Sequence, residues 1–348
     1  MTRRCSWLGR PLVVAGVSTA VIVGTAGVPR AAASVSSSGA TYVALGDSYA
    51  SGEGLGPFQS GTDVNSGAHK NTCHRSVHDA YADLSPPIVL PGVRSRALWA
   101  CSGATVADMQ NVPGRNGTPA QYGQPAQTAT VGGATDYVTL TVGGDDLGFA
   151  KIASACAAAE IFGHIVHFSS SSCGSIVTQE KAKIPALVVA LEQLYRTVLA
   201  RSAPSSELVV AGYPRIFPTS FAGLGDVHGQ PWCSFDHLFA IGTIGMPVPD
   251  VKAVAAFESA LNGAARSAVS AVGALDPGRI RFADIYPTSV PRTCRGYTRH
   301  ATVAGFELSP AGNGIGSGWK RFVSSATFHP TTDGQQVYAR AIQQQFAG

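Results

Sequence analysis

A serine in a setting typical of a nucleophile stands near the amino-terminal end of the chain. Ser48 follows the apolar run at 42–45 and precedes a glycine-rich stretch at 51–54. A short apolar strand that breaks into a glycine turn at its carboxyl end is where open α/β sheets present reactive side chains, because the following backbone amides point into a crevice. Ser48 is therefore a candidate nucleophile.

A serine hydroxyl is a poor nucleophile at neutral pH and needs a neighbouring base, most often an imidazole. The chain has nine histidines, and His329 lies directly before Pro330 and a predicted closing helix. A histidine there would sit at one edge of the sheet and could face a residue at the end of the first strand. On position alone, His329 is one candidate among the nine.

The elements that must position these residues recur as short β-rich runs, each followed by a turn and helix-like sequence. We predict strands at 41–45, 95–100, 137–142, 207–211 and 280–283, and helices at 183–200, 251–272 and 333–346. Runs such as 138–142 are typical of strands buried on both faces of a parallel sheet. The pattern indicates an α/β fold with a five-stranded, mostly parallel sheet and helices on both sides.

Three segments rich in Gly, Pro and Ser interrupt this rhythm, at 55–72, 214–249 and 286–328. Long irregular segments in a compact domain are usually functional loops or disorder. Each contains or precedes a cysteine, which favours ordered loops around a substrate cleft. The chain has no internal repeat, heptad pattern or linker, so we predict one domain at 41–348, preceded by a flexible segment at 34–40.

Residues 1–33 have the character of an export signal: arginines at the start, an apolar stretch at 12–28 and three alanines at 31–33. This segment holds four arginines and no acidic residue, so the remainder balances 21 basic against 21 acidic residues. A neutral chain without a basic patch argues against nucleic acid or an anionic membrane as an electrostatic partner. We expect a secreted, extracellular protein.

Six cysteines remain after that segment, at positions 73, 101, 156, 173, 233 and 294. An even number in an exported protein predicts a disulfide framework, although spacing alone cannot choose among the possible pairings. His164 and His167 stand near Cys156 and Cys173, but a bridge explains these cysteines better than a metal site, because no further ligand is near in sequence. We expect no metal.

Four short sequence blocks together resemble those of the GDSL or SGNH hydrolases, particularly the secreted actinobacterial esterases, lipases and phospholipases. The blocks read LGDS at 45–48, CSGA at 101–104, VGGDD at 142–146 and HP at 329–330. The resemblance implies a flavodoxin-like three-layer α/β/α fold with long, disulfide-stapled loops. It also implies a secreted serine ester hydrolase, a carboxylesterase or lipase that works through an acyl-enzyme without a cofactor, with a phospholipase A or a carbohydrate acetylesterase as alternatives.

The resemblance assigns roles to particular residues. Ser48 is the nucleophile and His329 the base, and the oxyanion hole is made of the backbone amides of Ser48 and Gly103 with a side chain from the third block. Gly103 has no side chain, so its N–H can approach a substrate closely. The same resemblance implies the disulfide pairs Cys73–Cys101, Cys156–Cys173 and Cys233–Cys294.

The first departure from the family pattern is Asp145, which stands where the third block normally carries Asn. An ionised carboxylate accepts hydrogen bonds and would repel an oxyanion. Three alternatives follow: the site keeps Asp145 protonated, catalysis relies on the two backbone amides, or the protein is a non-catalytic binding protein on a hydrolase scaffold.

The second departure is Ala326, which stands where many members carry the acid that orients the histidine. Some secreted relatives use a main-chain carbonyl at this place, so we expect the Ala326 carbonyl to accept the His329 Nδ1 proton. A neutral carbonyl fixes the tautomer but stabilises the imidazolium less than a carboxylate does.

The remaining expectations concern support and substrate. Asp47 should bond turn amides around Ser48, Asp146 should play a comparable role in the third block, and Glu53 should begin a helix. Apolar loop residues suit an acyl chain better than a polyanion: Leu55, Phe58, Phe217, Phe221, Trp232, Phe235 and Phe239. We expect a monomer that acts on a small-molecule or lipid ester, with at most transient contact with a lipid surface.

Overall fold

The computed structural model describes residues 39–65, 67, 69–110, 122, 124–161, 164–167, 172–218, 220–221, 224–227, 229–238, 242–294, 300–305, 307 and 323–347. The predicted export signal at 1–33 and Phe239 lie outside the described residues. The segment predicted to be flexible is described from Gly39 onward, and Ala40 already belongs to the first strand.

The central sheet has five parallel strands in the order β10-β6-β3-β1-β2. Their bounds are β1 Ala40–Gly46, β2 Val93–Leu98, β3 Thr135–Thr141, β6 Glu207–Ala211 and β10 Ile280–Ala283. The predicted runs thus all form strands of one parallel sheet. β1 lies between β2 and β3. Because all five strands run parallel, the turn that follows β1 lies at the carboxyl edge of the sheet, where α/β proteins place their sites.

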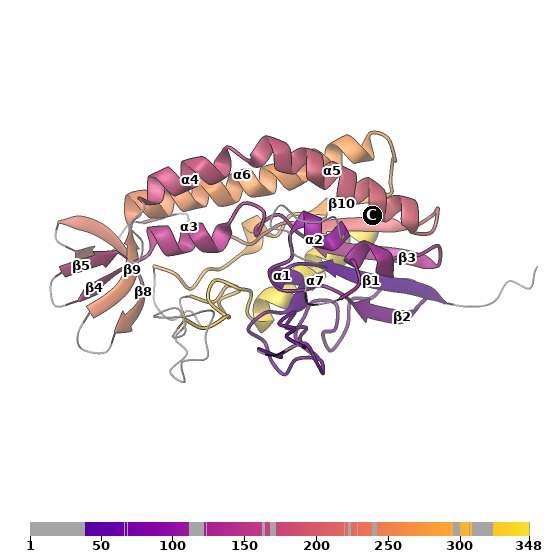
Figure 1. Ribbon diagram of the computed structural model, residues 1–348, viewed down its shortest axis with the longest axis horizontal. Helices are drawn as coiled ribbons and strands as arrows, with labels where there is room; N and C mark the ends of the chain where they lie inside the picture. The colour runs from indigo at the N-terminus through magenta and orange to yellow at the C-terminus, as the bar shows by residue number, and fades with distance from the viewer. Residues whose placement is uncertain are drawn as a thin grey trace, which may run out of the picture. The chain divides into compact units, whose positions relative to one another are not determined.

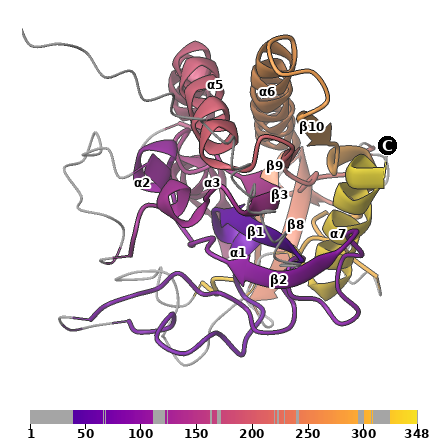
Figure 2. The ribbon, with the colours of Figure 1, turned by 90° about the vertical axis from the view of Figure 1, so that its right-hand side faces the viewer.

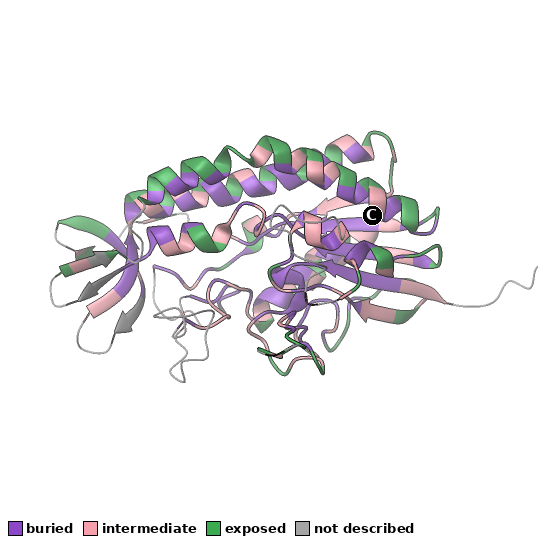
Figure 3. Cartoon of the chain, viewed as in Figure 1, coloured by how far each residue is buried: buried purple, intermediate pink, exposed green. Residues whose placement is uncertain are grey.

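Helices cover both faces of this sheet. Figure 2 shows α5 (Ile184–Arg201) and α6 (Val248–Gly273) on one face and α7 (Thr332–Ala347) on the other. In α5, Leu187, Leu191 and Leu194 are buried at helical spacing, and the opposite surface is exposed (Figure 3). The three-layer α/β/α architecture is the expected one. Among the described residues, no helix has the length and apolar character to cross a membrane.

A second, antiparallel sheet corrects the expectation of an irregular segment at 214–249. Its order is β5-β4-β9-β8-β7, and it packs against α6 (Figure 1). The bounds are β4 Ala158–Ile161, β5 His164–His167, β7 Asp226–Val227, β8 Gln230–Leu238 and β9 Gly242–Pro247. Proline, glycine and polar residues within these strands conceal the alternation that would have predicted them.

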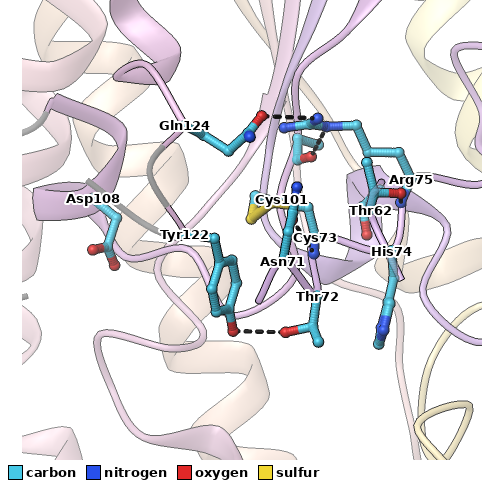
Figure 4. Close-up of a disulfide and its surroundings, with 12 residues drawn as sticks. Thr62, Asn71, Thr72, Cys73, His74, Arg75, Cys101, Asp108, Tyr122 and Gln124 are labelled. Carbon is cyan, nitrogen blue, oxygen red and sulfur yellow. Dashed lines mark hydrogen bonds between the residues drawn. A yellow bond between two sulfur atoms is a disulfide. The ribbon is translucent and has the colours of Figure 1, made fainter. Parts of the chain in front are cut away.

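The other α-helices of the described residues are shorter: α1 Ser48–Ser51, α2 Val106–Gln110, α3 Phe149–Cys156 and α4 Cys173–Lys181. The three disulfides have the pairing that the resemblance implied. Cys73–Cys101 joins the loop after α1 to the loop after β2, and the side chains around it are shown in Figure 4. Cys156–Cys173 occupies both cysteines that stand near His164 and His167, so neither is available as a metal ligand.

Candidate active site

Ser48 is the first residue of α1 and follows β1 after a single residue. It is buried, with 8% of its surface exposed. The turn before it requires glycine, because Gly46 has a φ of +137° and a Cβ there would lie 2.6 Å from the Thr141 carbonyl oxygen. Strand β1 therefore ends against β3, and the chain bends abruptly to present Ser48 at the sheet edge.

Asp47 fixes this bend, as the sequence analysis expected. Its carboxylate accepts hydrogen bonds from the Tyr49 amide at 3.0 Å, from the Thr141 hydroxyl at 2.7 Å and from the Tyr213 hydroxyl. Burial raises the pKa of Asp47 to about 6, although these three bonds favour its ionised form. Tyr213, which the sequence analysis missed, also accepts a hydrogen bond from the Gly144 amide at 2.9 Å and so links the first and third blocks.

The second block lies beside the nucleophile turn. The Cys101 amide donates to the Gly46 carbonyl at 2.9 Å, and Gly103 adopts a φ of +78° in the turn that follows. The Asp146 carboxylate accepts a hydrogen bond from the Val106 amide at 3.1 Å, which ties the third block to the start of α2. Asp146 is therefore a supporting residue, as expected.

Asp145 follows Gly144 at the carboxyl edge of the sheet. Burial raises its pKa to about 8, and the nearby negative charges of Asp47, Asp146, Asp108 and Glu53 act in the same direction. At neutral pH the Asp145 carboxyl is therefore mainly protonated. A protonated carboxyl carries an O–H donor, so this shift favours the first of the three alternatives for the departure from Asn.

His329 lies in a turn before α7, and the carbonyl that orients it differs from the expected one. Its Nδ1 is 3.1 Å from the Thr327 carbonyl oxygen, whereas the Ala326 carbonyl accepts the backbone N–H of His329 at 3.0 Å. The expectation for Ala326 is wrong because the turn from 326 to 329 directs the Ala326 carbonyl at the backbone N–H of His329 and the Thr327 carbonyl at its ring. Burial lowers the pKa of His329, which keeps the imidazole neutral and able to accept a proton.

The nucleophile turn and the histidine loop meet through Tyr49. The ring centroids of Tyr49 and His329 are 5.1 Å apart, and the Tyr49 hydroxyl donates to the Phe328 carbonyl at 3.0 Å. The Gln335 side chain on α7 donates to the Tyr49 carbonyl at 3.0 Å. The residue next to Ser48 is thus held against the residue next to His329, although 279 positions separate Tyr49 from Phe328.

Three of the apolar loop residues, Phe217, Trp232 and Phe235, have a different role from the one expected, whereas Leu55, Phe58 and Phe221 are half-buried. Phe217, Phe235 and Phe328 pack together with centroid distances of 5.5 to 6.3 Å and are buried, as is Trp232. Because Phe328 directly precedes His329, this cluster packs against the histidine loop. These side chains belong to the core and are not a surface for an acyl chain.

A cavity of about 530 Å³ borders Asp145 between α2, α3 and α5. Its wall combines apolar residues such as Val106, Leu147 and Leu187 with six charged residues, which are Asp108, Asp145, Asp146, Lys151, Glu180 and Lys183. This volume lies in the range of small-molecule sites, but the charged wall differs from the mostly apolar lining of such sites.

Gly54 determines how closely the loop after α1 approaches the histidine loop. Its φ is +82°, and a Cβ there would lie 2.5 Å from the Cα of Ala326. We expect Gly54→Ala to displace the histidine loop and to lower kcat/KM for an ester roughly tenfold to a hundredfold, because small misplacements of catalytic groups are costly. Steady-state kinetics and a thermal melt measure the effect.

Gly61→Ala is the matched control for this prediction. Gly61 also has a positive φ, +76°, but a Cβ there meets no atom within 4 Å. It carries the same backbone strain without the contact. Equal losses of activity in the two variants would contradict the role given to the Gly54 contact.

The chain matches the model of a known protein family. The model of the GDSL-like lipase/acylhydrolase family matches residues 44–337. A lipase from Streptomyces rimosus is 32% identical over 177 residues, which are 51% of this chain and 53% of that lipase. Lipase 2 of Streptomyces coelicolor is 30% identical over 267 residues, 75% of this chain and 77% of its own length. The match thus spans about half the length of the Streptomyces rimosus relative.

Two solved structures share the fold. The extracellular lipase from Streptomyces rimosus has a TM-score of 0.58 at 23% identity, and phospholipase A1 from Streptomyces albidoflavus has a TM-score of 0.57 at 24% identity. Each comparison covers 88% of this chain and 99% of the other.

Proposed function

Because this chain belongs to the GDSL-like lipase/acylhydrolase family, we propose that it is a serine ester hydrolase in which Ser48 is the nucleophile and His329 the base. The observation that carries this proposal is the contact of Tyr49 with His329 and Phe328, which holds the Ser48 turn against the histidine loop. A hydroxyl and an imidazole at the carboxyl edge of one sheet are the two groups that acyl transfer needs.

The proposed reaction passes through an acyl-enzyme. His329 takes the Ser48 proton while Oγ bonds to the ester carbonyl carbon, and the carbonyl oxygen becomes an oxyanion. The imidazolium then gives this proton to the leaving alcohol as the ester bond breaks. A water molecule, deprotonated by His329, then attacks the acyl carbon; the bond to Ser48 Oγ breaks, the imidazolium returns its proton to Oγ, and the acid is released.

Three donors are proposed to hold the oxyanion: the backbone amides of Ser48 and Gly103 and the protonated carboxyl of Asp145. Donors prearranged at that point are typically worth about 3 to 4 kcal/mol each. The hydrogen bond from His329 Nδ1 to the Thr327 carbonyl fixes the tautomer, so that Nε2 is the proton acceptor. The hydrogen bonds of Thr327 and Ser325 to His329 come from their neutral backbones, so neither brings a negative charge to the imidazolium.

We propose a carboxylesterase or lipase that acts on acyl esters outside the cell as a monomer, with phospholipase A and carbohydrate acetylesterase activity as the alternatives. The names of the relatives support the first of these. Three disulfides support an oxidising compartment, because such bridges persist there.

A panel of esters tests this function. We expect turnover of p-nitrophenyl esters with kcat/KM higher for the octanoate than for the acetate, since each buried methylene contributes about 0.8 kcal/mol, roughly a factor of four. Fatty acid release from phosphatidylcholine or acetate release from acetylated xylan, at a higher kcat/KM than any simple ester, would replace the main proposal by the corresponding alternative. Absence of turnover on all three substrate classes would favour a non-catalytic binding protein.

A further inference from the structure

A buried carboxylate that the mechanism does not use lies beside the nucleophile turn. Glu53 directly follows Gly52, the residue that caps the end of α1, so it does not begin a helix as the sequence analysis expected. Only 3% of its surface is exposed. Its two oxygens lie 2.8 and 2.7 Å from Nδ1 of His74, and it also accepts a hydrogen bond from Ser102.

His74 is built into the site by several contacts. Its Nε2 lies 3.3 Å from an Asp63 oxygen, and its ring stacks on Phe58 with centroids 4.8 Å apart. Its φ is +46°, a backbone conformation that is uncommon for a residue other than glycine. The neighbouring Cys73–Cys101 disulfide anchors this segment, and Figure 4 shows the His74 ring pointing away from the disulfide.

The backbone at Glu53 and Gly54 contacts both the Ser48 turn and the loop that carries His329. Its amide donates to the Ser48 carbonyl at 3.2 Å, and the next residue, Gly54, packs directly on Ala326 of the histidine loop. Ser102, which binds the carboxylate, precedes Gly103. The carboxylate therefore lies where the nucleophile turn, the oxyanion loop and the histidine loop meet.

A buried carboxylate is costly unless it is paired and hydrogen-bonded. The bonds to His74 and Ser102 satisfy Glu53, and they lower its pKa against the effect of burial, so that it is ionised at neutral pH. The carboxylate in turn raises the pKa of His74. The result is a fixed negative charge inside the catalytic region, beside an imidazole whose cationic form it stabilises.

We propose that Glu53, held by His74, is the electrostatic positioning group for His329 and supplies the negative charge that the residue at 326 lacks. This inference rests on the proposed function. When Ser48 transfers its proton, His329 becomes an imidazolium, and a fixed carboxylate nearby stabilises that charge without a direct hydrogen bond. The chain would thereby combine a backbone carbonyl for orientation with a remote carboxylate for charge.

The charges that face His329 make a signed prediction possible. Burial lowers its pKa, the Glu53 carboxylate raises it, and the His74 cation lowers it. Glu53→Gln should therefore lower the pKa of His329 and shift the acidic limb of the kcat/KM profile to lower pH. His74→Gln keeps a hydrogen bond to Glu53 but removes the cation, so it should raise the pKa of His329 and shift the acidic limb of the profile to higher pH.

The test is an NMR titration of the His329 imidazole in the wild type and the two variants, together with pH profiles of ester turnover. We expect opposite pKa shifts and a fall in kcat of about tenfold for Glu53→Gln. Glu207→Gln is the matched control, because it removes a carboxylate that pairs with Arg281 in the central sheet. That control should leave the His329 pKa and kcat unchanged.

Two outcomes would overturn the inference: an unchanged His329 pKa in both variants, or shifts of the same sign in both. If one variant does not fold, the sign of the shift in the other decides. The NMR titration needs no turnover, so an inactive wild type would reject the proposed function while the role of Glu53 is still tested. A variant with lower kcat but an unshifted pKa would assign Glu53 a purely structural role.

Discussion

Ser48→Ala and His329→Ala each lower kcat/KM for p-nitrophenyl octanoate by at least about 10⁴-fold, and the double variant is no worse than either single one. The two groups act as one unit, so the loss of either removes the covalent route, and their effects do not add. Residual turnover comes from the oxyanion donors and substrate binding alone. Stopped-time assays with background subtraction measure the ratios.

Matched controls separate catalysis from folding in this prediction. Ser205→Ala and His300→Ala change the same residue types at exposed positions, and both should keep wild-type rates. Circular dichroism should show equal secondary structure in all variants. A loss of less than tenfold for either Ser48 or His329 would contradict the assigned roles.

Asp145→Asn changes the alkaline side of the pH profile more than the neutral rate. With a pKa of about 8, the Asp145 carboxyl is protonated and donates at pH 7, and it ionises as the pH rises. Above that pH the wild-type kcat should fall about tenfold per pH unit, because the protonated carboxyl that donates to the oxyanion is replaced by a carboxylate that repels it. The Asn variant keeps a neutral donor, so its rate should stay level.

At pH 9.5 we therefore expect Asp145→Asn to exceed the wild type by more than tenfold, with rates within about threefold at pH 6.5. The groups that face Asp145 are Asp47, Asp146, Asp108 and Glu53, all acidic, so none of them lowers its pKa. Asp226→Asn, at an exposed position, is the control and should follow the wild-type profile. Parallel profiles for Asp145→Asn and the wild type would show that Asp145 does not take part in the oxyanion hole.

The parts of the fold with strong local signals could be predicted from the sequence. Buried parallel strands such as β3 are nearly continuous apolar or β-branched runs, and α5 shows helical spacing of leucines, so both were found. Ser48 stood out from its strand and glycine turn, whereas the choice of His329 among nine histidines and the disulfide pairs came from the resemblance of four short blocks to a family. The strands, the helices and the Ser48 turn are each encoded within a few neighbouring residues, whereas the disulfides join cysteines 17 to 61 positions apart.

The features that were missed depend on contacts between distant segments. Strand β8 carries Pro231, Cys233 and Ser234, so its sequence has little preference for a strand. Its pairing with β9 nevertheless makes it one. The pair of Glu53 and His74 joins residues 21 positions apart in an irregular loop, for which no periodic pattern exists. The choice of the Thr327 carbonyl over that of Ala326 depends on the path of a single turn.

The central claim is that His329 activates Ser48, and covalent labelling with a fluorophosphonate tests it most directly. The account predicts a single adduct on Ser48 in the wild type, located by peptide mass spectrometry, labelling at least 100-fold slower in His329→Ala and none at that position in Ser48→Ala. An adduct on a different serine, or a folded wild-type protein that does not react, would contradict it.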